Sequence, residues 1–99
     1  MNIYRNITTA GSATTLIIKD SNVGGNVSKI TISNNSDNPA TIIVDLVDGA
    51  STVFYICKNI VIPKGAVLVL EDNVQFDSAK YNLRIYNTGT GPDLTVIIK

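Results

Sequence analysis

The stretch Asn59-Ile-Val-Ile-Pro-Lys-Gly-Ala-Val-Leu-Val-Leu-Glu-Asp72 contains two apolar runs separated by a turn signal. Pro63 presets φ for the first central position of a turn, and Gly65 suits the left-handed position that closes a short loop. The segment therefore predicts a β-hairpin between Ile60–Ile62 and Ala66–Leu70. It is built from Val, Ile and Leu and carries no nucleophile or phosphate-binding loop.

The rest of the chain also consists of short apolar runs separated by turn residues. β-Branched residues dominate, and short apolar runs are separated by Gly, Asn, Asp and Pro at the spacing typical of a sandwich or barrel. Asp48-Gly49, between Thr41–Val47 and Thr52–Lys58, is a strong hairpin signal. Further strands are expected at Ile3–Thr8, Ala13–Lys19, Val27–Ser33, Val74–Phe76, Tyr81–Tyr86 and Leu94–Lys99.

These elements predict one all-β domain over residues 1–99, with residues 1–26 forming an extended N-terminal arm plus the first strands. The expected fold is a single antiparallel β-sandwich of about eight short strands, with jelly-roll or Ig-like topology. Within one strand, Tyr81, Leu83 and Ile85 alternate with polar residues, which predicts one buried and one wet face.

The charge pattern narrows the possible partners. The net charge is zero, from eight basic and eight acidic side chains, and no basic run is present. This argues against nucleic acid or an anionic membrane as a partner. Charged residues make up 16% of the chain, against the usual quarter. Such a surface is either partly covered by other molecules or rich in Thr, Ser and Asn. No secretory signal or membrane-spanning run is expected.

The sequence offers little for catalysis. Histidine is absent and Cys57 is the only cysteine, so neither an ordinary triad nor an intramolecular disulfide is expected. Cys57 lies in an apolar strand and is interpreted as a small hydrophobe. Asp20-Ser-Asn22 and Asp72-Asn73 are only fragments of a calcium-loop pattern. We therefore predict no enzymatic activity, no catalytic residue, no cofactor and no metal site.

Two groups of side chains are candidates for binding. In the Asp48-Gly49 hairpin, a loop of even length pairs even positions of the first strand with odd positions of the second. One face of the hairpin then belongs to the core, and its residues are Ile42, Val44, Leu46, Val53, Tyr55 and Cys57. The opposite face then holds Ile43, Phe54 and Ile56, which either lie under another part of the chain, such as the N-terminal strand, or form an interface. A bulge or an odd-length loop would change this pairing. Tyr4 and Tyr86 are the candidate exposed aromatics, which a glycan-binding surface would use for stacking.

Several motifs resemble a group of short bacteriophage virion structural proteins, including those of cyanophages. The matching segments are Lys29-Ile-Thr-Ile-Ser-Asn34, Asp48-Gly49, Lys58-Asn-Ile-Val-Ile-Pro-Lys-Gly65, Val67-Leu-Val-Leu-Glu-Asp-Asn73 and Tyr81-Asn-Leu-Arg-Ile85. The resemblance extends over about residues 27–98, and its motifs consist of residues typical of strands and turns, so it supplies no functional residues.

This resemblance implies a non-enzymatic virion component, above all a capsid decoration (cement) protein that attaches to the capsid lattice through protein–protein contacts. A neck, tail or fibre accessory protein is the alternative it leaves open. The residues themselves also leave open a glycan- or protein-binding adhesion module and, more remotely, a calcium-dependent binder. The expected partners are major capsid or tail proteins and further copies of the chain, for example in a trimer, with no nucleic acid and no membrane. The expected location is the virion, after synthesis in the host cytoplasm.

Overall fold

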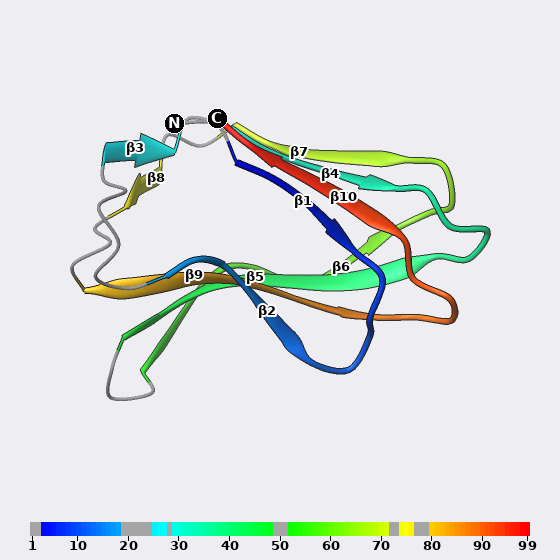
Figure 1. Cartoon of the computed structure of the whole chain (residues 1–99), viewed down its shortest axis with the longest axis horizontal. Coiled ribbons are helices and arrows are strands. Elements are labelled where there is room, and N and C mark those ends of the chain that lie inside the picture. Colours follow the sequence, from blue (N-terminus) through cyan, green and yellow to red (C-terminus); the bar gives the residue numbers. More distant parts are fainter. Residues whose placement is uncertain (1–2, 19–24, 28, 49–51, 72–73, 77–79) are drawn as a thin grey trace.

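The structure, a computed structural model, describes residues 3–18, 25–27, 29–48, 52–71, 74–76 and 80–99. Over these ranges the chain forms strands and no helix (Figure 1). The strands are β1 (Ile3–Ile7), β2 (Ala13–Ile17), β3 (Gly25–Val27), β4 (Ile30–Asn34), β5 (Ala40–Asp48), β6 (Val53–Ile62), β7 (Val67–Leu70), β8 (Val74–Phe76), β9 (Tyr81–Thr88) and β10 (Leu94–Ile98). The predicted all-β class is confirmed. The predicted strand at 27–33 is divided between β3 and β4, and the two predicted between 52 and 62 are the single strand β6.

Two four-stranded antiparallel sheets form the sandwich. Sheet A has the order β1-β10-β4-β7, and sheet B has the order β2-β9-β5-β6. The first strand therefore pairs with the last and the second with the last but one, a nested order that is the jelly-roll arrangement. Strand β3, which precedes β4, pairs with β8, which follows β7, in a separate two-stranded ladder. Of the two topologies that the sequence left open, the jelly roll is the one observed.

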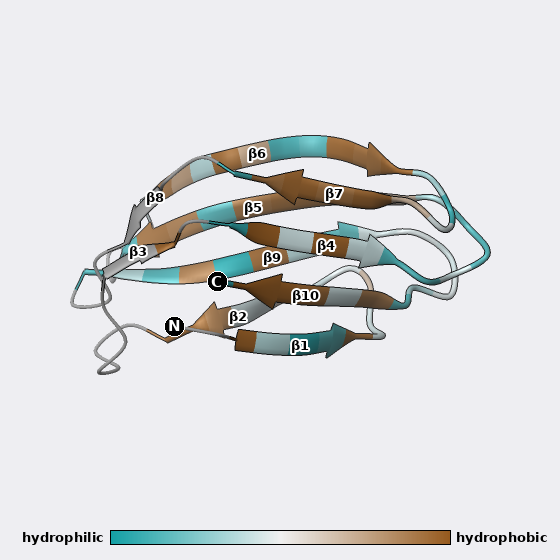
Figure 2. Cartoon of the chain, turned by 90° about the horizontal axis from the view of Figure 1, so that it is seen from above, coloured by the Kyte–Doolittle hydropathy of each residue, from teal (hydrophilic) through white to brown (hydrophobic). Residues whose placement is uncertain are grey.

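The N-terminal strands belong to the sandwich itself. Strand β1 is an edge of sheet A and β2 is an edge of sheet B, and both lie on the same side of the molecule (Figure 2). Arg5 connects these two edges because its Nη2 donates a hydrogen bond of 3.2 Å to the carbonyl oxygen of Thr15. The opposite side of the sandwich is formed by β6 and β7.

The core lies between the inner faces of the two sheets. Alternate residues point inward, as in β4 and β10, whose burial alternates residue by residue. The buried apolar side chains are Ile7, Leu16, Ile17, Val27, Ile30, Ile32, Ala40, Ile42, Val44, Ile62, Leu83, Ile85, Leu94, Val96 and Ile98. Removal from water stabilises the fold by about 1.5–3 kcal/mol for each large side chain. The predicted burial of Leu83 and Ile85 is confirmed.

The predicted hairpin around Pro63 and Gly65 is wrong, although the turn itself is present. The amide of Ala66 donates to the carbonyl of Pro63 at 3.1 Å, and Gly65 has a φ of 71°. The two runs nevertheless separate after the turn, because β6 pairs with β5 in sheet B whereas β7 pairs with β4 in sheet A. The segment therefore carries the chain from one sheet to the other.

Asn34, at the end of β4, holds this crossing in place. Its side chain is buried, and Nδ2 donates to the carbonyl oxygens of Asn38 and Ile62, each at 2.9 Å. Its Oδ1 accepts bonds from the amide and the hydroxyl of Ser36, at 3.1 and 2.7 Å. The backbone of Asn34 also pairs with Gly65 and Ala66, each bond being 2.9 Å long. The Asn34 side chain thus connects the β4–β5 loop to the end of β6 in sheet B.

The Asp48-Gly49 hairpin is confirmed, but its predicted register is wrong near the turn. Strands β5 and β6 pair with Val47 opposite Val53 and Leu46 opposite Phe54, which corresponds to an odd-length loop. An irregularity between Val44 and Asp45 brings Val44 opposite Cys57, which agrees with the predicted shared face. A second irregularity, between Ile42 and Val44, then places Ile42 opposite Ile60. Residues 49–51 lie outside the described residues.

Asn87 is a polar exception in the core. Its side chain is fully buried on the inner face of β9, opposite Ile42, and no described residue hydrogen-bonds its amide oxygen or nitrogen. A buried amide without partners costs free energy. We expect Asn87→Leu to raise the free energy of unfolding by about 1–2 kcal/mol, measured by urea denaturation. Asn87→Asp, which adds a buried charge, is expected to lower the free energy of unfolding. A destabilised Asn87→Leu protein would show that the amide is hydrogen-bonded in solution.

Candidate functional site

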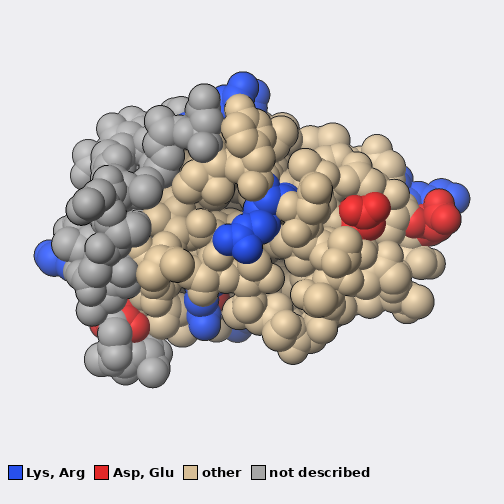
Figure 3. All heavy atoms as spheres, viewed as in Figure 1, with Lys and Arg blue, Asp and Glu red and all other residues tan. Residues whose placement is uncertain are grey.

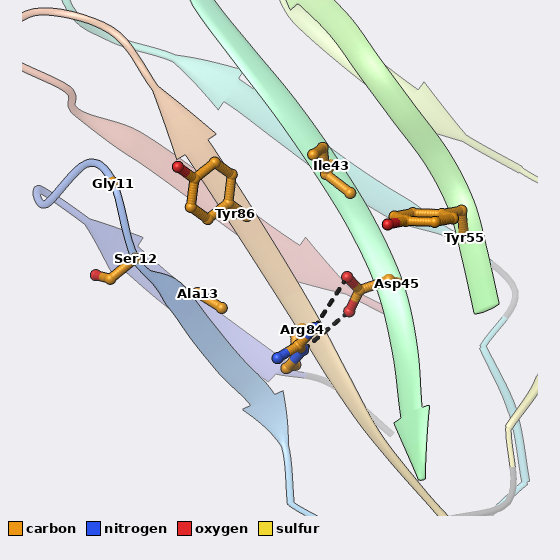
Figure 4. A pocket seen from close by; sticks show the side chains of 8 residues that line it. All are labelled: Gly11, Ser12, Ala13, Ile43, Asp45, Tyr55, Arg84 and Tyr86. Carbon is orange, nitrogen blue, oxygen red and sulfur yellow. Dashed lines mark hydrogen bonds and ion pairs between the residues drawn. The ribbon is translucent and has the colours of Figure 1, made fainter. Parts of the chain in front are cut away.

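The outer face of sheet B contains a shallow hollow of about 380 Å³. Two neighbouring rows of side chains cross the strands here: Ala13, Tyr86 and Ile43 in one row, and Arg84, Asp45 and Tyr55 in the other. The loop residues Gly11 and Ser12 complete the rim (Figure 4). This loop is held against β9 because the amide of Gly11 donates to the carbonyl of Asn87 at 3.0 Å. We call this hollow the sheet B hollow.

An ion pair forms the polar part of the sheet B hollow. Arg84 Nε lies 3.0 Å from Asp45 Oδ1, and Nη2 lies 3.2 Å from Oδ2, so the pair is bidentate. The Asp45 side chain is 8% exposed and the Arg84 side chain 29%. A carboxylate this deeply buried on an outer face is unusual unless it is paired. The two residues are paired across β5 and β9, so the sheet register itself brings them together.

Two tyrosines stand on either side of this pair. Tyr86 is half-buried next to the Gly11–Ala13 segment, and Tyr55 lies on the β6 side, with Ile43 between them (Figure 4). Lys58 Nζ lies 4.7 Å from the centroid of the Tyr55 ring, a cation–π distance. Within the described ranges no ring or cation packs in this way on Tyr86.

The structure separates the three residues of the candidate interface. Ile43 lines the sheet B hollow on the outer face. Phe54 is 51% exposed, but it pairs with the inward position Leu46 and makes an edge-to-face contact with Tyr81, with ring centroids 5.8 Å apart. Ile56 packs partly buried against the core. The predicted common face is therefore wrong, because the odd-length loop and the bulges turn Phe54 and Ile56 away from Ile43.

The two candidate aromatics lie on different sheets. Tyr4 is 66% exposed on the outer face of sheet A, so its predicted exposure is confirmed. Tyr86 is only half-buried and belongs to the sheet B hollow.

The predicted place of Tyr55 on the core face of the Asp48-Gly49 hairpin is wrong, because Tyr55 lies opposite Asp45 on the outer face and is 52% exposed. Asp45 and Arg84 were not singled out from the sequence. The only available signal was an acid and a base on the polar faces of two apolar strands.

The surroundings of Cys57 do not favour a reactive thiol. Burial raises the pKa of the Cys57 thiol, and a backbone hydrogen bond at Val44 acts in the opposite direction to a smaller extent. Less thiolate is therefore present at neutral pH than in an exposed cysteine. No cluster of three or more potential metal-ligating His, Cys, Asp or Glu residues occurs in the described part of the chain. The calcium-loop fragments at 20–22 and 72–73 lie outside it. Across the described ranges, no helix has the length and apolar character needed to cross a membrane.

A second surface feature lies along the side of the sandwich formed by β6 and β7. Four aliphatic side chains are exposed on these two strands, namely Ile60, Val61, Val67 and Val69, with exposed fractions between 37% and 58%. Val67 and Val69 lie on the outer face of sheet A, Val61 lies on the outer face of sheet B, and Ile60 occupies an inward position at the open edge of β6. Both strands are outermost in their sheets, so each has one edge without a neighbouring strand among the described residues. Figure 2, which looks onto sheet A, shows β7 apolar along its whole length. We call these four residues the β6–β7 edge.

No protein-family model matches this sequence, and no curated protein matches it.

Proposed function

We propose that this chain is a non-enzymatic bacteriophage virion structural protein, and specifically a capsid decoration protein that attaches to other virion proteins through its β6–β7 edge. The observation that carries this proposal is the exposure of four aliphatic side chains on β6 and β7, the edge strands of the two sheets on one side of the sandwich. Exposed apolar patches mark interaction surfaces, and open strand edges accept further strands.

The two strands of this edge differ in how well they are protected. Strand β6 carries Lys58 and is irregular near Asn59, whose φ is 57°, and both features discourage a further strand. Strand β7 is Val67-Leu-Val-Leu70, with no charge and a regular register against β4. It is therefore the better acceptor for a strand of a capsid or tail protein, or of another copy in a homo-oligomer.

Two general features support the same proposal. Jelly-roll sandwiches are common in viral capsid proteins, although a fold alone does not fix a function. Charged residues also make up only 16% of the chain, and on the β1–β2 side of the molecule, which Figure 3 shows, they are scattered. Such a surface suits close attachment to a protein lattice, because little charge has to be removed from water.

Val67→Lys combined with Val69→Lys tests the proposal. The unmodified protein is expected to cosediment with capsids of the phage that encodes it, and immunogold electron microscopy should place it on the head. The double variant should keep its melting temperature within a few degrees but lose cosedimentation, because two lysines oppose burial of this edge. The matched control is Tyr4→Lys, which changes an exposed apolar residue on the opposite edge of sheet A and should leave attachment intact.

Three results would separate the alternatives. Labelling at the neck, tail or fibre would favour an accessory protein at that position over a decoration protein. A monomer at high concentration that binds neither capsid nor tail proteins would contradict the structural role altogether. Equal loss of attachment in Tyr4→Lys and in the double variant would contradict the assignment of the contact to the β6–β7 edge.

A further inference from the structure

The sheet B hollow combines hydrogen-bonding groups and an aromatic wall in one open site. Arg84 has five N–H groups, of which Nε and Nη2 each use one on Asp45. Within the described residues, the guanidinium makes no other hydrogen bond, so three N–H groups remain to donate to a ligand. Each Asp45 oxygen has a further lone pair to accept from one. The pair thus presents donors and acceptors side by side, already fixed in position by their own two hydrogen bonds.

The charge of the site points to an uncharged ligand. Asp45 and Arg84 cancel each other, and the other side chains that line the hollow are uncharged. An anion that approached Arg84 would meet the carboxylate of Asp45, and a cation that approached Asp45 would meet the guanidinium. A neutral molecule with neighbouring hydroxyl groups can instead donate to one partner and accept from the other without leaving a charge unpaired.

The walls of the hollow suit the same kind of ligand. Tyr86 lies next to the ion pair and has no ring or cation packed on it among the described residues, whereas the ring of Tyr55 is already in contact with Lys58. A tyrosine ring beside fixed polar groups can stack against the apolar C–H face of a sugar ring while the hydroxyls meet the polar groups. A volume of about 380 Å³ lies at the small end of the range for ligand sites.

We propose that the sheet B hollow is a binding site for a neutral saccharide. Arg84 and Asp45 hydrogen-bond two neighbouring hydroxyls, and Tyr86 stacks against the sugar ring. The site uses none of the four residues of the β6–β7 edge. A protein that attaches through that edge therefore keeps the hollow available, and loss of saccharide binding leaves the attachment test unaffected.

Titrations with methyl glycosides of glucose, galactose and mannose test this site in the ¹⁵N-labelled protein. We expect at least one of them to shift the Arg84 Nε–H resonance and the amides of Tyr86 and Ala13, with a Kd in the millimolar range because the hollow is open. Glucuronate and N-acetylneuraminate are the anionic comparison probes and should bind more weakly. No shift from any of the neutral glycosides at about 50 mM, well above a Kd of a few millimolar, would overturn the proposal. Stronger binding of the anionic probes would also overturn it.

Substitutions of Tyr86 and Arg84 test whether these residues bind the saccharide by stacking and by hydrogen bonding. Tyr86→Ala should weaken binding by about tenfold or more, whereas Tyr86→Phe, which keeps the ring, should bind within a few-fold of the unmodified protein. Arg84→Lys keeps the charge but loses the planar fork, so it should also weaken binding. Tyr4→Ala, on the other sheet, is the control and should not change the Kd. Melting temperatures show whether each variant is folded, and full binding by folded Tyr86→Ala and Arg84→Lys proteins would refute the assignment.

Discussion

Asn34→Ala is expected to lower the free energy of unfolding by about 2–4 kcal/mol. The substitution removes a side chain that is 1% exposed and that makes hydrogen bonds in two directions. The carbonyls of Asn38 and Ile62 lose a donor, and the amide of Ser36 loses an acceptor. Alanine also leaves a small cavity where the amide was.

Urea denaturation of the two proteins measures this effect, with far-UV circular dichroism as the probe. Ser36→Ala is the matched control because it removes only the hydroxyl, which donates to Asn34 and to the carbonyl of Asn38. Its expected cost is about 1 kcal/mol. A loss of less than about 1 kcal/mol for Asn34→Ala would show that these hydrogen bonds do not hold the crossing between the sheets.

Gly89→Ala is expected to cost about 2–3 kcal/mol, for two separate reasons. The φ of Gly89 is 148°, a conformation that residues with a side chain rarely adopt. An added Cβ would also lie 2.9 Å from the carbonyl oxygen of Pro39, which belongs to the backbone and cannot rotate away. Either the β9–β10 loop or the start of β5 must move.

Gly91→Ala distinguishes the cost of the positive φ from the cost of the steric contact with Pro39. Gly91 has a φ of 56°, but a Cβ there would meet no atom within 4 Å. Its substitution should therefore cost only the backbone strain, about 1 kcal/mol. Thermal unfolding of the two variants measures the difference. Equal losses of stability in Gly89→Ala and Gly91→Ala would mean that the contact with Pro39 does not add to the cost of substituting Gly89.

Both predictions concern the same end of the sandwich. The β4–β5 loop, the Pro63–Gly65 turn and the β9–β10 loop meet there (Figure 1). Asn34 connects the first two, and Asn38 donates to the carbonyl of Thr90 in the third at 3.0 Å. These bonds replace the ladder hydrogen bonds that end where the strands separate, so this end depends on a few side chains instead of a continuous sheet.

Local sequence patterns were enough for the strands and for part of the core. The alternation of Leu83 and Ile85 with polar residues predicted an inner and an outer face, because side chains of a strand point alternately to its two sides. Asp48-Gly49 predicted a hairpin, since a turn of this kind depends only on its own residues and neighbours. Pro63 and Gly65 predicted a turn for the same reason.

Local patterns failed where the answer depended on partners distant in the sequence. The turn at Pro63–Gly65 looks the same whether its strands pair with each other or with two different sheets. The face of Phe54 depended on the loop length and on bulges in β6, and a shift of one residue moves a side chain to the other face.

The sequence by itself therefore determined that this protein is an antiparallel β-sandwich with a small apolar core, because those properties follow from composition and from the period of two along each strand. The tertiary structure alone decided the jelly-roll order, the exposed β6–β7 edge and the sheet B hollow. Arg84 and Asp45 are 39 positions apart, and only the register of β9 against β5 places them side by side. That register is fixed by the packing of the whole core, which no short segment contains.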